Sequence, residues 1–377
     1  MTRLLHFADL HLDRSFAGLG MAVSEASKRR EELRDALRRI VSLAIELDVD
    51  VLTVGGDLYE HERATDDTGR FIAEQFQRLH PRPVLVAPGN HDPNLPDSLY
   101  HRIQWPKNVH IFAKPIWEQR RFGDSFVVWG AGHVSPDLRD NLLAQLRVDR
   151  GDGVAVALLH ASDISAVPEN KQAHCPFRRE DVENSGVAFA LLGHYHELRL
   201  KPDGQPLFGY PGSPEPLSFG EPGHHYVLLL EADSAGVKVE PLAINQVRYE
   251  TAEIDITGMT HSDRVRQAIQ ALAGDDGYSP AIMRVELVGQ AEPELDLDLD
   301  SLLSSCAQHF RYLDPILDRT EPPFDLDEMR QESTTRGKFV QIMEQRIRAA
   351  AGPEAETLKK ALHYGLQAFG GREIRRR

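Results

Sequence analysis

Two histidines, His194 and His196, flank Tyr195 directly after the apolar run "FALLG". In an extended segment residues two apart point to the same side, so the two imidazoles can converge on one point. Imidazole nitrogens are frequent metal ligands, but an isolated H-x-H pair is more often two surface histidines. The pair therefore predicts a metal site only if other ligand residues reach the same place.

Other apolar stretches also lead into residues that can bind a metal. Asp9 and His11 repeat the two-residue spacing, and Asp57 follows a pair of glycines. The whole predicted ligand set is Asp9, His11, Asp57, Asn90, His160, His194 and His196. These residues are too many for one ordinary site, and they suit two divalent ions about 3.5–4 Å apart if Asp57 bridges them. Oxygen and imidazole ligands without thiolate suit Mn²⁺, Fe or Zn²⁺.

Short buried strands are predicted immediately before these residues. The apolar runs lie at 3–8, 49–56, 82–89, 125–132, 154–160 and 189–194, and amphipathic stretches at 29–47 and 68–79 predict helices. The pattern indicates an α/β protein with layered central sheets. In such folds ligands bind outside the carboxyl ends of the strands, so segments far apart in the sequence can meet there.

Length and composition indicate a globular protein with a sizeable core. The 377 residues are 41% hydrophobic, which predicts two or three domains. No apolar run approaches the roughly 20 residues of a membrane span, and the start of the chain lacks a signal-peptide pattern, so we expect a cytoplasmic protein that does not contact a membrane. Cys175 and Cys306 lie far apart in the sequence and support neither a disulfide framework nor a thiolate cluster.

The formal net charge of −15 argues against a protein that binds nucleic acid mainly by electrostatics. The basic segment 27–39 interleaves arginines with acidic residues at helical spacing, which is typical of a solvated helix face. The basic tail 371–377 carries little weight. Any action on nucleic acid must therefore rest on the metal site.

The motifs "DLH", "GGD", "GNHD", a histidine after an apolar strand, and "GHYH", in this order, resemble those of the calcineurin-like metallophosphoesterases. The stretches "LLHFADLHLD", "LTVGGDLYE", "PVLVAPGNHDP" and "FGYPGSPEPLSFGE" further resemble the SbcD-type DNA repair exonucleases, which work with a coiled-coil SbcC-type ATPase. The resemblance covers most of the chain up to about Gln246.

This resemblance implies a fold and a division of the chain. We expect a layered α/β/β/α sandwich over 1–246, a small α/β capping domain over 247–320 that contacts DNA, and a C-terminal helix pair within 321–377. It also implies how two metals, Mn²⁺ first among the candidates, would share the ligands. The first would take Asp9, His11, Asp57 and His196, and the second would take Asp57, Asn90, His160 and His194.

The resemblance also assigns roles to residues beside the ligands. His91 matches the catalytic histidine, and a histidine next to a ligand but not needed as one can deliver a proton to the leaving oxygen. Asp92 would orient His91 or cap the turn. Glu60 stands where many nucleases of this group have a second histidine. It could lie behind the metal ligands or face solvent, and we expect solvent.

Some candidates have weaker support. Tyr210, Gly212 and Ser213 of "YPGS" would border the active site and contact substrate, by resemblance. His6 lies inside the first apolar strand, where a buried core histidine is the more frequent case. Outside the motifs stand His133, His174, His224 and His225, which we assign to no site.

Beyond Gln246 the apolar pattern predicts strand, helix, strand, helix and strand, followed by two amphipathic helices. The stripe Phe339, Val340, Met343 and Ile347, and a second stripe from Leu358 to Phe369, could dock on a coiled-coil ATPase or pack against the capping domain. Gly352-Pro353 would separate the two helices. We also expect a homodimer.

Three functions compete. The first is a two-metal phosphodiesterase that cleaves DNA as an exonuclease or endonuclease subunit of double-strand-break repair. The second is a phosphatase or nucleotide phosphodiesterase on the same fold, which the acidic charge favours. The third is a non-catalytic scaffold, which the complete ligand set argues against.

Overall fold

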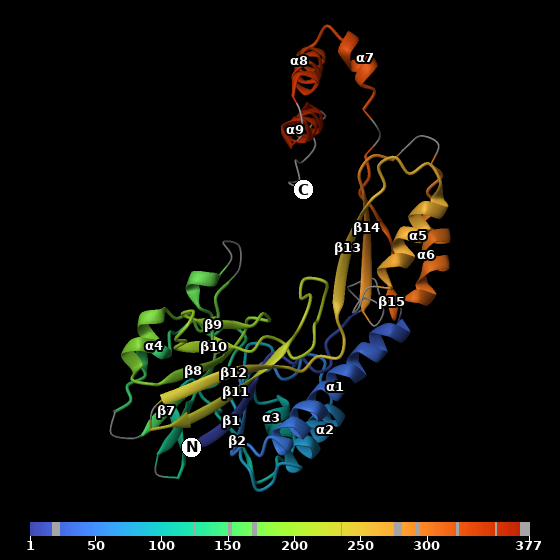
Figure 1. The fold of residues 1–377 in the computed structure, drawn as a ribbon. Helices are drawn as coiled ribbons and strands as arrows, with labels where there is room; N and C mark the ends of the chain where they lie inside the picture. The colour runs from blue at the N-terminus through green and yellow to red at the C-terminus, as the bar shows by residue number, and fades with distance from the viewer. Residues whose placement is uncertain are drawn as a thin grey trace. The chain divides into compact units, whose positions relative to one another are not determined.

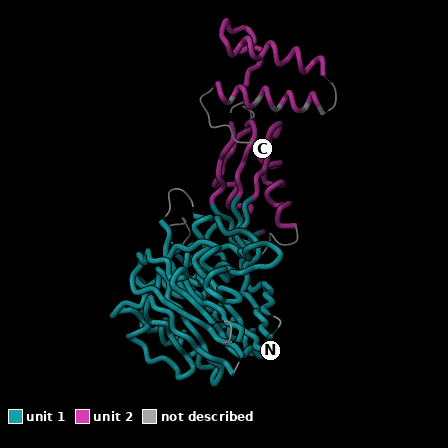
Figure 2. The backbone as a smooth tube through the Cα atoms, turned by 90° about the vertical axis from the view of Figure 1, so that its left-hand side faces the viewer, with its two compact units in different colours: residues 1–251, 275–284, 310–314 teal, residues 252–274, 285–309, 315–377 magenta. Residues whose placement is uncertain are grey.

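A computed structural model describes residues 1–16, 23–123, 125–149, 153–167, 172–234, 236–274, 281–291, 295–321, 324–350 and 353–369. The chain divides into two compact units, which Figure 2 colours separately. The first comprises Met1–Thr251, Asp275–Arg284 and Phe310–Asp314, and the second comprises Ala252–Gly274, Val285–His309 and Pro315–Arg377. The expected division into three domains at residues 246 and 320 stays a prediction.

The first unit contains a six-stranded sheet with four neighbouring parallel strands. Side chains of its first strand alternate between two apolar clusters: Leu5 and Phe7 pack with helices, and Leu4 packs with the second sheet. Two antiparallel strands complete one edge. The order is β12 (Gly236–Ala243), β11 (Tyr226–Asp233), β1 (Thr2–Phe7), β2 (Val51–Val54), β3 (Val84–Val86) and β4 (Val109–Ile111).

A second six-stranded sheet also has a parallel centre, with one antiparallel strand at each edge. Its central strands are buried on both faces, which explains their continuous apolar sequences. The order is β5 (Glu118–Phe122), β6 (Phe126–Gly130), β7 (Val154–His160), β8 (Phe189–Gly193), β10 (Phe208–Tyr210) and β9 (Arg199–Lys201).

Helices cover the outer faces of both sheets. The first sheet packs against α1 (Val23–Glu46), α2 (Asp66–Gln77) and α3 (Leu99–Arg102), as Figure 1 shows. The second packs against α4 (Arg179–Ser185) and the short 3₁₀ turn Leu143–Gln145. A third apolar cluster lies between the two sheets. The predicted α/β/β/α layering is therefore confirmed, with all six predicted strands and both predicted helices.

The next segments alternate as the sequence predicts. A third sheet contains β13 (Tyr249–Asp255), β14 (Ile282–Val288) and β15 (Tyr312–Leu313), and β16 (Leu317–Asp318) also pairs with β14. In the second unit α5 (Ser262–Leu272) buries Val265 and Ile269, and α6 (Leu299–Cys306) lies beside it (Figure 1). Short 3₁₀ turns occur at Ile164–Ala166 and Ala307–His309.

Three helices follow where the sequence predicts two: α7 (Leu326–Gln331), α8 (Thr335–Ala349) and α9 (Pro353–Phe369). We refer to them as the C-terminal helices. The prediction missed α7 because its six residues are too short to show a periodic pattern. The sequence predicts a break between the last two helices at Gly352-Pro353, and α9 begins at Pro353. Gly352 and the basic tail 371–377 lie outside the described residues.

The apolar stripes of α8 and α9 pack against each other. Val340 and Met343 of α8 are buried with Leu362 and Leu366 of α9, and partly buried Phe339 packs against them. Within the described chain this cluster draws only on residues between Phe324 and Leu366. The first predicted stripe is thus buried or partly buried in a local core, and Leu362 and Leu358 of the second stripe join it. Phe369 of the second stripe is 44% exposed, and Ile342 of α8 is 43% exposed.

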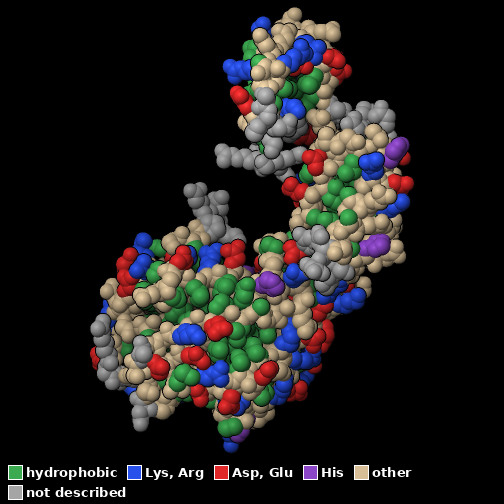
Figure 3. All heavy atoms as spheres, in the orientation of Figure 1, with side chains coloured by type: hydrophobic (Ala, Val, Ile, Leu, Met, Phe, Trp, Pro, Cys, Tyr) green, Lys and Arg blue, Asp and Glu red, His purple; other side chains and the backbone are tan. Residues whose placement is uncertain are grey.

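The surface carries charges of both signs. On the face drawn in Figure 3, Lys and Arg side chains intermingle with Asp and Glu over the first unit. None of the described helices is long and apolar enough to cross a membrane.

Candidate metal centre

Four of the seven predicted ligands have a positive φ angle rather than an extended backbone, whereas His160 is the last residue of β7. The φ angles of Asp9, His11 and Asp57 are 55°, 51° and 51°, and that of His194 is 118°. The expected alternation of side chains along a strand is therefore wrong for these residues, because β1 ends at Phe7 and β8 at Gly193. Non-glycine residues in this region are strained, and such strain is frequent at functional sites.

Asp57 lies between the other predicted ligands. Its Oδ1 accepts a hydrogen bond of 2.8 Å from the backbone N–H of His91. Its Oδ2 lies 3.7 Å from Nε2 of His11 and 3.5 Å from Nε2 of His160. The carboxylate is buried, and a Cβ at Gly89 would collide with its Oδ1. One oxygen of Asp57 is thus held in place and the other faces two histidines, as a bridging ligand requires.

On one side of Asp57, two histidine nitrogens face each other. Nε2 of His11 lies 3.2 Å from Nε2 of His196. The Nδ1 of His11 lies 2.9 Å from Oε1 of Glu60, and the Nδ1 of His196 lies 2.8 Å from Oε1 of Glu221. Since an ionised carboxylate can only accept, each Nδ1 carries the proton and each neutral ring leaves an unprotonated Nε2. When both rings are neutral, their two lone pairs face each other, and a cation between them would remove the repulsion.

The other side of Asp57 repeats this arrangement. The Nδ1 of His160 lies 2.9 Å from the carbonyl oxygen of Gly55, so it must donate and leave Nε2 unprotonated. That Nε2 lies 2.9 Å from Oδ1 of Asn90, which is also an acceptor. The ring of His194 lies 5.3 Å from that of His160, centroid to centroid. A second cation would resolve this contact as well.

The donor set fits two divalent cations. Two nitrogens that each lie about 2.1 Å from one ion are roughly 3.0–3.4 Å apart in tetrahedral or octahedral geometry, as the His11 and His196 nitrogens are. Potential ligand atoms lie within 4.8 Å of one another in three groups, which are Asp9, His11 and His196; His11, Asp57 and His91; and Asp9, Asp57 and His160. Asp9 belongs to two of these groups and so reaches both sides of Asp57. Its carboxylate also accepts a hydrogen bond of 3.0 Å from the backbone N–H of His194.

Burial keeps most of these imidazoles neutral. It lowers the pKa of His11 and His160, and it lowers that of His194 to about 4. Burial also lowers the pKa of His196, but the hydrogen bond to Glu221 and the negative charges of Asp9, Glu221 and Asp57 together outweigh burial, so the net shift is upward. Neutral imidazole is the form that binds a metal.

His91 lies at the edge of this cluster with one partner that the sequence did not predict. Its Nδ1 lies 3.0 Å from Oε2 of Glu60, and its side chain is 45% exposed. The hydrogen bond to Glu60 raises the pKa of His91 to about 9, so the ring is protonated at neutral pH. The prediction that Glu60 faces solvent is wrong, because its two oxygens contact His11 and His91 and only 18% of its side chain is exposed.

Asp92 caps the turn and does not contact the ring of His91. Its buried carboxylate accepts hydrogen bonds from the backbone N–H groups of Asp57, Leu58 and Gly89, at 2.9, 2.9 and 2.6 Å, and from the hydroxyl of Tyr100 at 2.6 Å. Burial raises the pKa of Asp92 to about 7. Of the two predicted roles, the structure supports the cap.

The three residues expected to contact substrate lie beneath the site. The hydroxyl of buried Tyr210 donates to the carbonyl of Ala161 at 2.9 Å. At Gly212 a Cβ would approach the carbonyl oxygen of His196 to 2.5 Å, and the backbone N–H of Ser213 donates to the same oxygen at 3.1 Å. None of the three lines the pocket at the site. Gly212 and Ser213 support the turn that holds His196, and Tyr210 supports the segment that follows His160.

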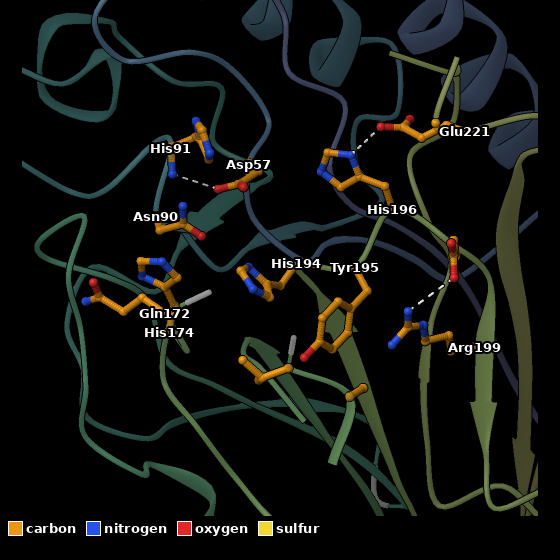
Figure 4. A pocket seen from close by; sticks show the side chains of 14 residues that line it. Asp57, Asn90, His91, Gln172, His174, His194, Tyr195, His196, Arg199 and Glu221 are labelled. Atoms are coloured by element: carbon orange, nitrogen blue, oxygen red, sulfur yellow. Dashed lines mark hydrogen bonds and ion pairs between the residues drawn. The ribbon is translucent and has the colours of Figure 1, made fainter. Parts of the chain in front are cut away.

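A pocket of about 650 Å³ opens over the site. In Figure 4, Asn90, His91, His194 and His196 surround it, and His196 is hydrogen-bonded to Glu221. Several lining residues were not predicted. They are Gln172, His174, Tyr195, Arg199 and Glu221.

The histidines outside the motifs have separate positions. The Nε2 of His133 lies 2.8 Å from the carbonyl oxygen of His160, and the ring of His174 lies 5.5 Å from that of His194. His225 is buried, with Nδ1 2.7 Å from the carbonyl oxygen of Ser213. His6 is a core histidine as predicted, with its ring nitrogens 3.0 Å from Oγ1 of Thr53 and 3.1 Å from the carbonyl oxygen of Leu192. For His133, His174 and His225 only the partners in the folded chain reveal these positions.

The chain is similar to known phosphoesterases. It is 27% identical over 330 residues to the uncharacterized metallophosphoesterase YhaO of Bacillus subtilis, over 83% of this chain and 80% of that one. It is 26% identical over 369 residues to the DNA double-strand break repair protein Mre11 of Methanopyrus kandleri, over 89% and 77%. The Mre11 protein of Haloferax volcanii is 29% identical over 311 residues, with coverage of 78% and 62%. The family model for calcineurin-like phosphoesterases matches residues 2–198, just over half of the chain, and this protein therefore belongs to that family.

Proposed function

We propose that this protein is a two-metal phosphodiesterase that cleaves DNA, in the manner of an SbcD-type repair nuclease. The family fold binds a pair of divalent metals, and its members hydrolyse phosphoester bonds. The observation that carries the proposal is the pair of partly buried contacts, His11 with His196 and His160 with Asn90, in which acceptor atoms face each other and which two cations would stabilise. DNA as substrate is supported by the similarity to proteins named for double-strand break repair.

The residues around the pocket divide the chemical work. When bound, two divalent ions supply charge neutralisation of the phosphate and activation of a water for in-line attack. His91, protonated and exposed to the pocket, donates a proton to the leaving oxygen. Glu60 accepts from its Nδ1 and leaves Nε2–H free to reach the substrate. Asp92 fixes the turn that carries Asn90 and His91.

Mn²⁺ is the metal we propose, since the site offers carboxylate, amide and imidazole ligands without thiolate. The proposal extends to a partner ATPase, a homodimer and a capping domain over 247–320 that contacts DNA, all of which rest on the resemblance to SbcD-type nucleases. The docking element for the ATPase would be the C-terminal helices as one folded body. Most of their apolar side chains already pack against each other, so their outer faces, which include Ile342 and Phe369, would make the contact.

A phosphatase or nucleotide phosphodiesterase is the second candidate. The net charge is −15, and among the described residues that line the pocket Arg199 is the single Lys or Arg. Its guanidinium also forms an ion pair of 3.1 Å with Glu197. Little positive charge is therefore available to hold a long nucleic acid, which favours a small substrate. A non-catalytic scaffold would not need His91 held in a protonated state beside the ligands.

The two candidates can be separated by comparing substrates. Purified protein with Mn²⁺ would be given linear duplex DNA, a small chromogenic phosphodiester and the matching phosphomonoester, with Asp57→Asn as the inactive control. Degradation of DNA that depends on Mn²⁺ and on Asp57 is the expected result. Hydrolysis of the phosphomonoester with intact DNA would replace the proposal with the phosphatase. If the metal-loaded protein hydrolyses none of these substrates, the non-catalytic scaffold would be the remaining explanation.

A further inference from the structure

The histidines on the two sides of Asp57 have different partners behind them. His11 and His196 each donate from Nδ1 to a carboxylate, Glu60 and Glu221 respectively. His160 donates from Nδ1 to the backbone carbonyl of Gly55. Within the described chain no carboxylate is hydrogen-bonded to the ring of His194. The two halves of the site therefore differ in how strongly their imidazoles are polarised.

The charges of the two halves differ in the same direction. The first half contains the two carboxylates behind His11 and His196. The second half contributes the neutral amide of Asn90 and two imidazoles that lack such carboxylates. Asp57 faces both halves, and Asp9 groups with His11 and His196 as well as with Asp57 and His160, so neither of these two charges favours one half. A divalent cation gains more Coulomb energy where carboxylates cluster, and burial weakens the screening of that attraction.

We propose that Glu221 and Glu60 are the positioning residues that make the metal position at Asp9, His11 and His196 the tighter of the two. The inference rests on the proposed two-metal function. A carboxylate that accepts from the outer nitrogen of a ligating histidine fixes its tautomer and raises its basicity, and loss of such a partner typically costs about 10–100-fold in metal affinity. The second position would fill only at higher metal concentration.

Glu221 offers the cleaner test of the two residues. Its Oε2 accepts from the hydroxyl of Ser213 and the backbone N–H of Leu217, both at 2.9 Å, which aims Oε1 at His196. Only 12% of its side chain is exposed. Glu60, in contrast, is shared between His11 and His91, so its replacement would also change the proposed proton donor.

A purely structural role for Glu221 is the alternative explanation. The same carboxylate ties Ser213 and Leu217 together, so its loss could loosen the turn without any direct effect on the imidazole. Ser213→Ala separates the two roles, because it removes one hydrogen bond of the turn and leaves the carboxylate on His196. Glu197→Gln is the matched control, since Glu197 lines the same pocket but pairs with Arg199.

The experiment is a titration of the metal-free full-length protein with Mn²⁺ alone, by calorimetry and by electron paramagnetic resonance. Wild type should show two classes of site at least about tenfold apart in affinity, with a mononuclear spectrum at one equivalent. Glu221→Gln should weaken the tighter class by about 10–100-fold and leave the weaker class unchanged. His194→Ala should abolish the weaker class alone, and Ser213→Ala and Glu197→Gln should preserve the difference between the classes.

Each contrary result overturns the inference. Two equal sites in wild type contradict it directly. An unchanged tight class in Glu221→Gln, or an equal loss in Ser213→Ala, assigns Glu221 to the turn. Loss of the tight class in His194→Ala reverses the order of the sites. The titration contains no substrate, so its result is independent of nuclease activity. Unequal metal binding by a protein that fails to cut DNA would refute the nuclease proposal and leave this inference intact. Equal metal binding by an active nuclease would refute this inference and leave the nuclease proposal intact.

Discussion

The metal centre and the C-terminal helices are stabilised in opposite ways. The centre joins residues as far apart in sequence as His11 and His196, 185 positions, through partly buried polar contacts. The core of the C-terminal helices joins residues between Phe324 and Leu366 through apolar side chains. One region needs the rest of its unit to exist, and the other is built from local contacts.

This difference predicts how far the effect of a substitution should spread in each region. In the centre most side chains have more than one partner, as Asp57, Asp92 and Glu60 do, so one change removes several contacts at once. In the C-terminal helices a change should unfold a local element and spare the remainder. The expected effects below run from the largest to the smallest.

Asp57→Asn should break the centre most completely. Removal of the charge that faces both His11 and His160 should lower turnover by on the order of 10³-fold or more and reduce the bound metal below two ions per chain. Steady-state kinetics and elemental analysis measure both. Asp97→Asn, at an exposed position, is the control and should change neither. Full metal occupancy in Asp57→Asn would contradict the bridging role.

His91→Asn should separate chemistry from metal binding. Loss of the proton donor should lower turnover by about 10²-fold, while metal content stays at the wild-type level. The same assays apply, with exposed His101→Asn as the control. A matching loss of metal would instead make His91 a ligand, as its place near His11 and Asp57 permits.

His6→Gln should change how the stability of the first unit depends on pH. Burial lowers the pKa of His6 to about 4 from 6.5, so the unfolded chain binds a proton that the folded chain excludes. Stability should therefore fall as pH decreases from about 6.5 towards 4, by up to about 3 kcal/mol from this residue. Denaturant melts at pH 7 and pH 5 should give a shallower dependence in His6→Gln, and an identical slope would contradict this source of acid sensitivity.

Changes in the C-terminal helices should have the smallest effect on the centre. Val340→Asp places a charge in their buried core and should unfold them locally, which hydrogen exchange would detect. Truncation after residue 323 should leave metal content and activity on small phosphodiesters unchanged, and shift the main Tm by less than about 2 °C. An insoluble or metal-free truncated protein would show that these helices belong to the main core, and would remove them as a docking element.

The sequence predicted the strands and long helices well because periodicity is a local signal. The sequence also predicted that Asp9 and His11 lie at the site, but it predicted an extended backbone for them. Both residues instead have a positive φ angle, because they follow the end of β1 at Phe7. Glu60 was assigned to solvent and Glu221 to no role. Their partners lie 49 and 25 residues away, and no spacing within the sequence reveals which carboxylate will reach which imidazole.

His6 has a consequence for how the protein acquires its metals. Its ring connects Thr53 of the first sheet to Leu192 of the second. Each half of the centre also takes residues from both sheets: His11 from the first meets His196 from the second, and Asn90 meets His160 in the same way. Neither half can exist before the sheets dock, which is a late event in folding because these contacts are distant in sequence. Metal binding should then follow the docking of the two sheets. Because the ions bind only the docked state, they should stabilise the interface between the sheets and slow its opening.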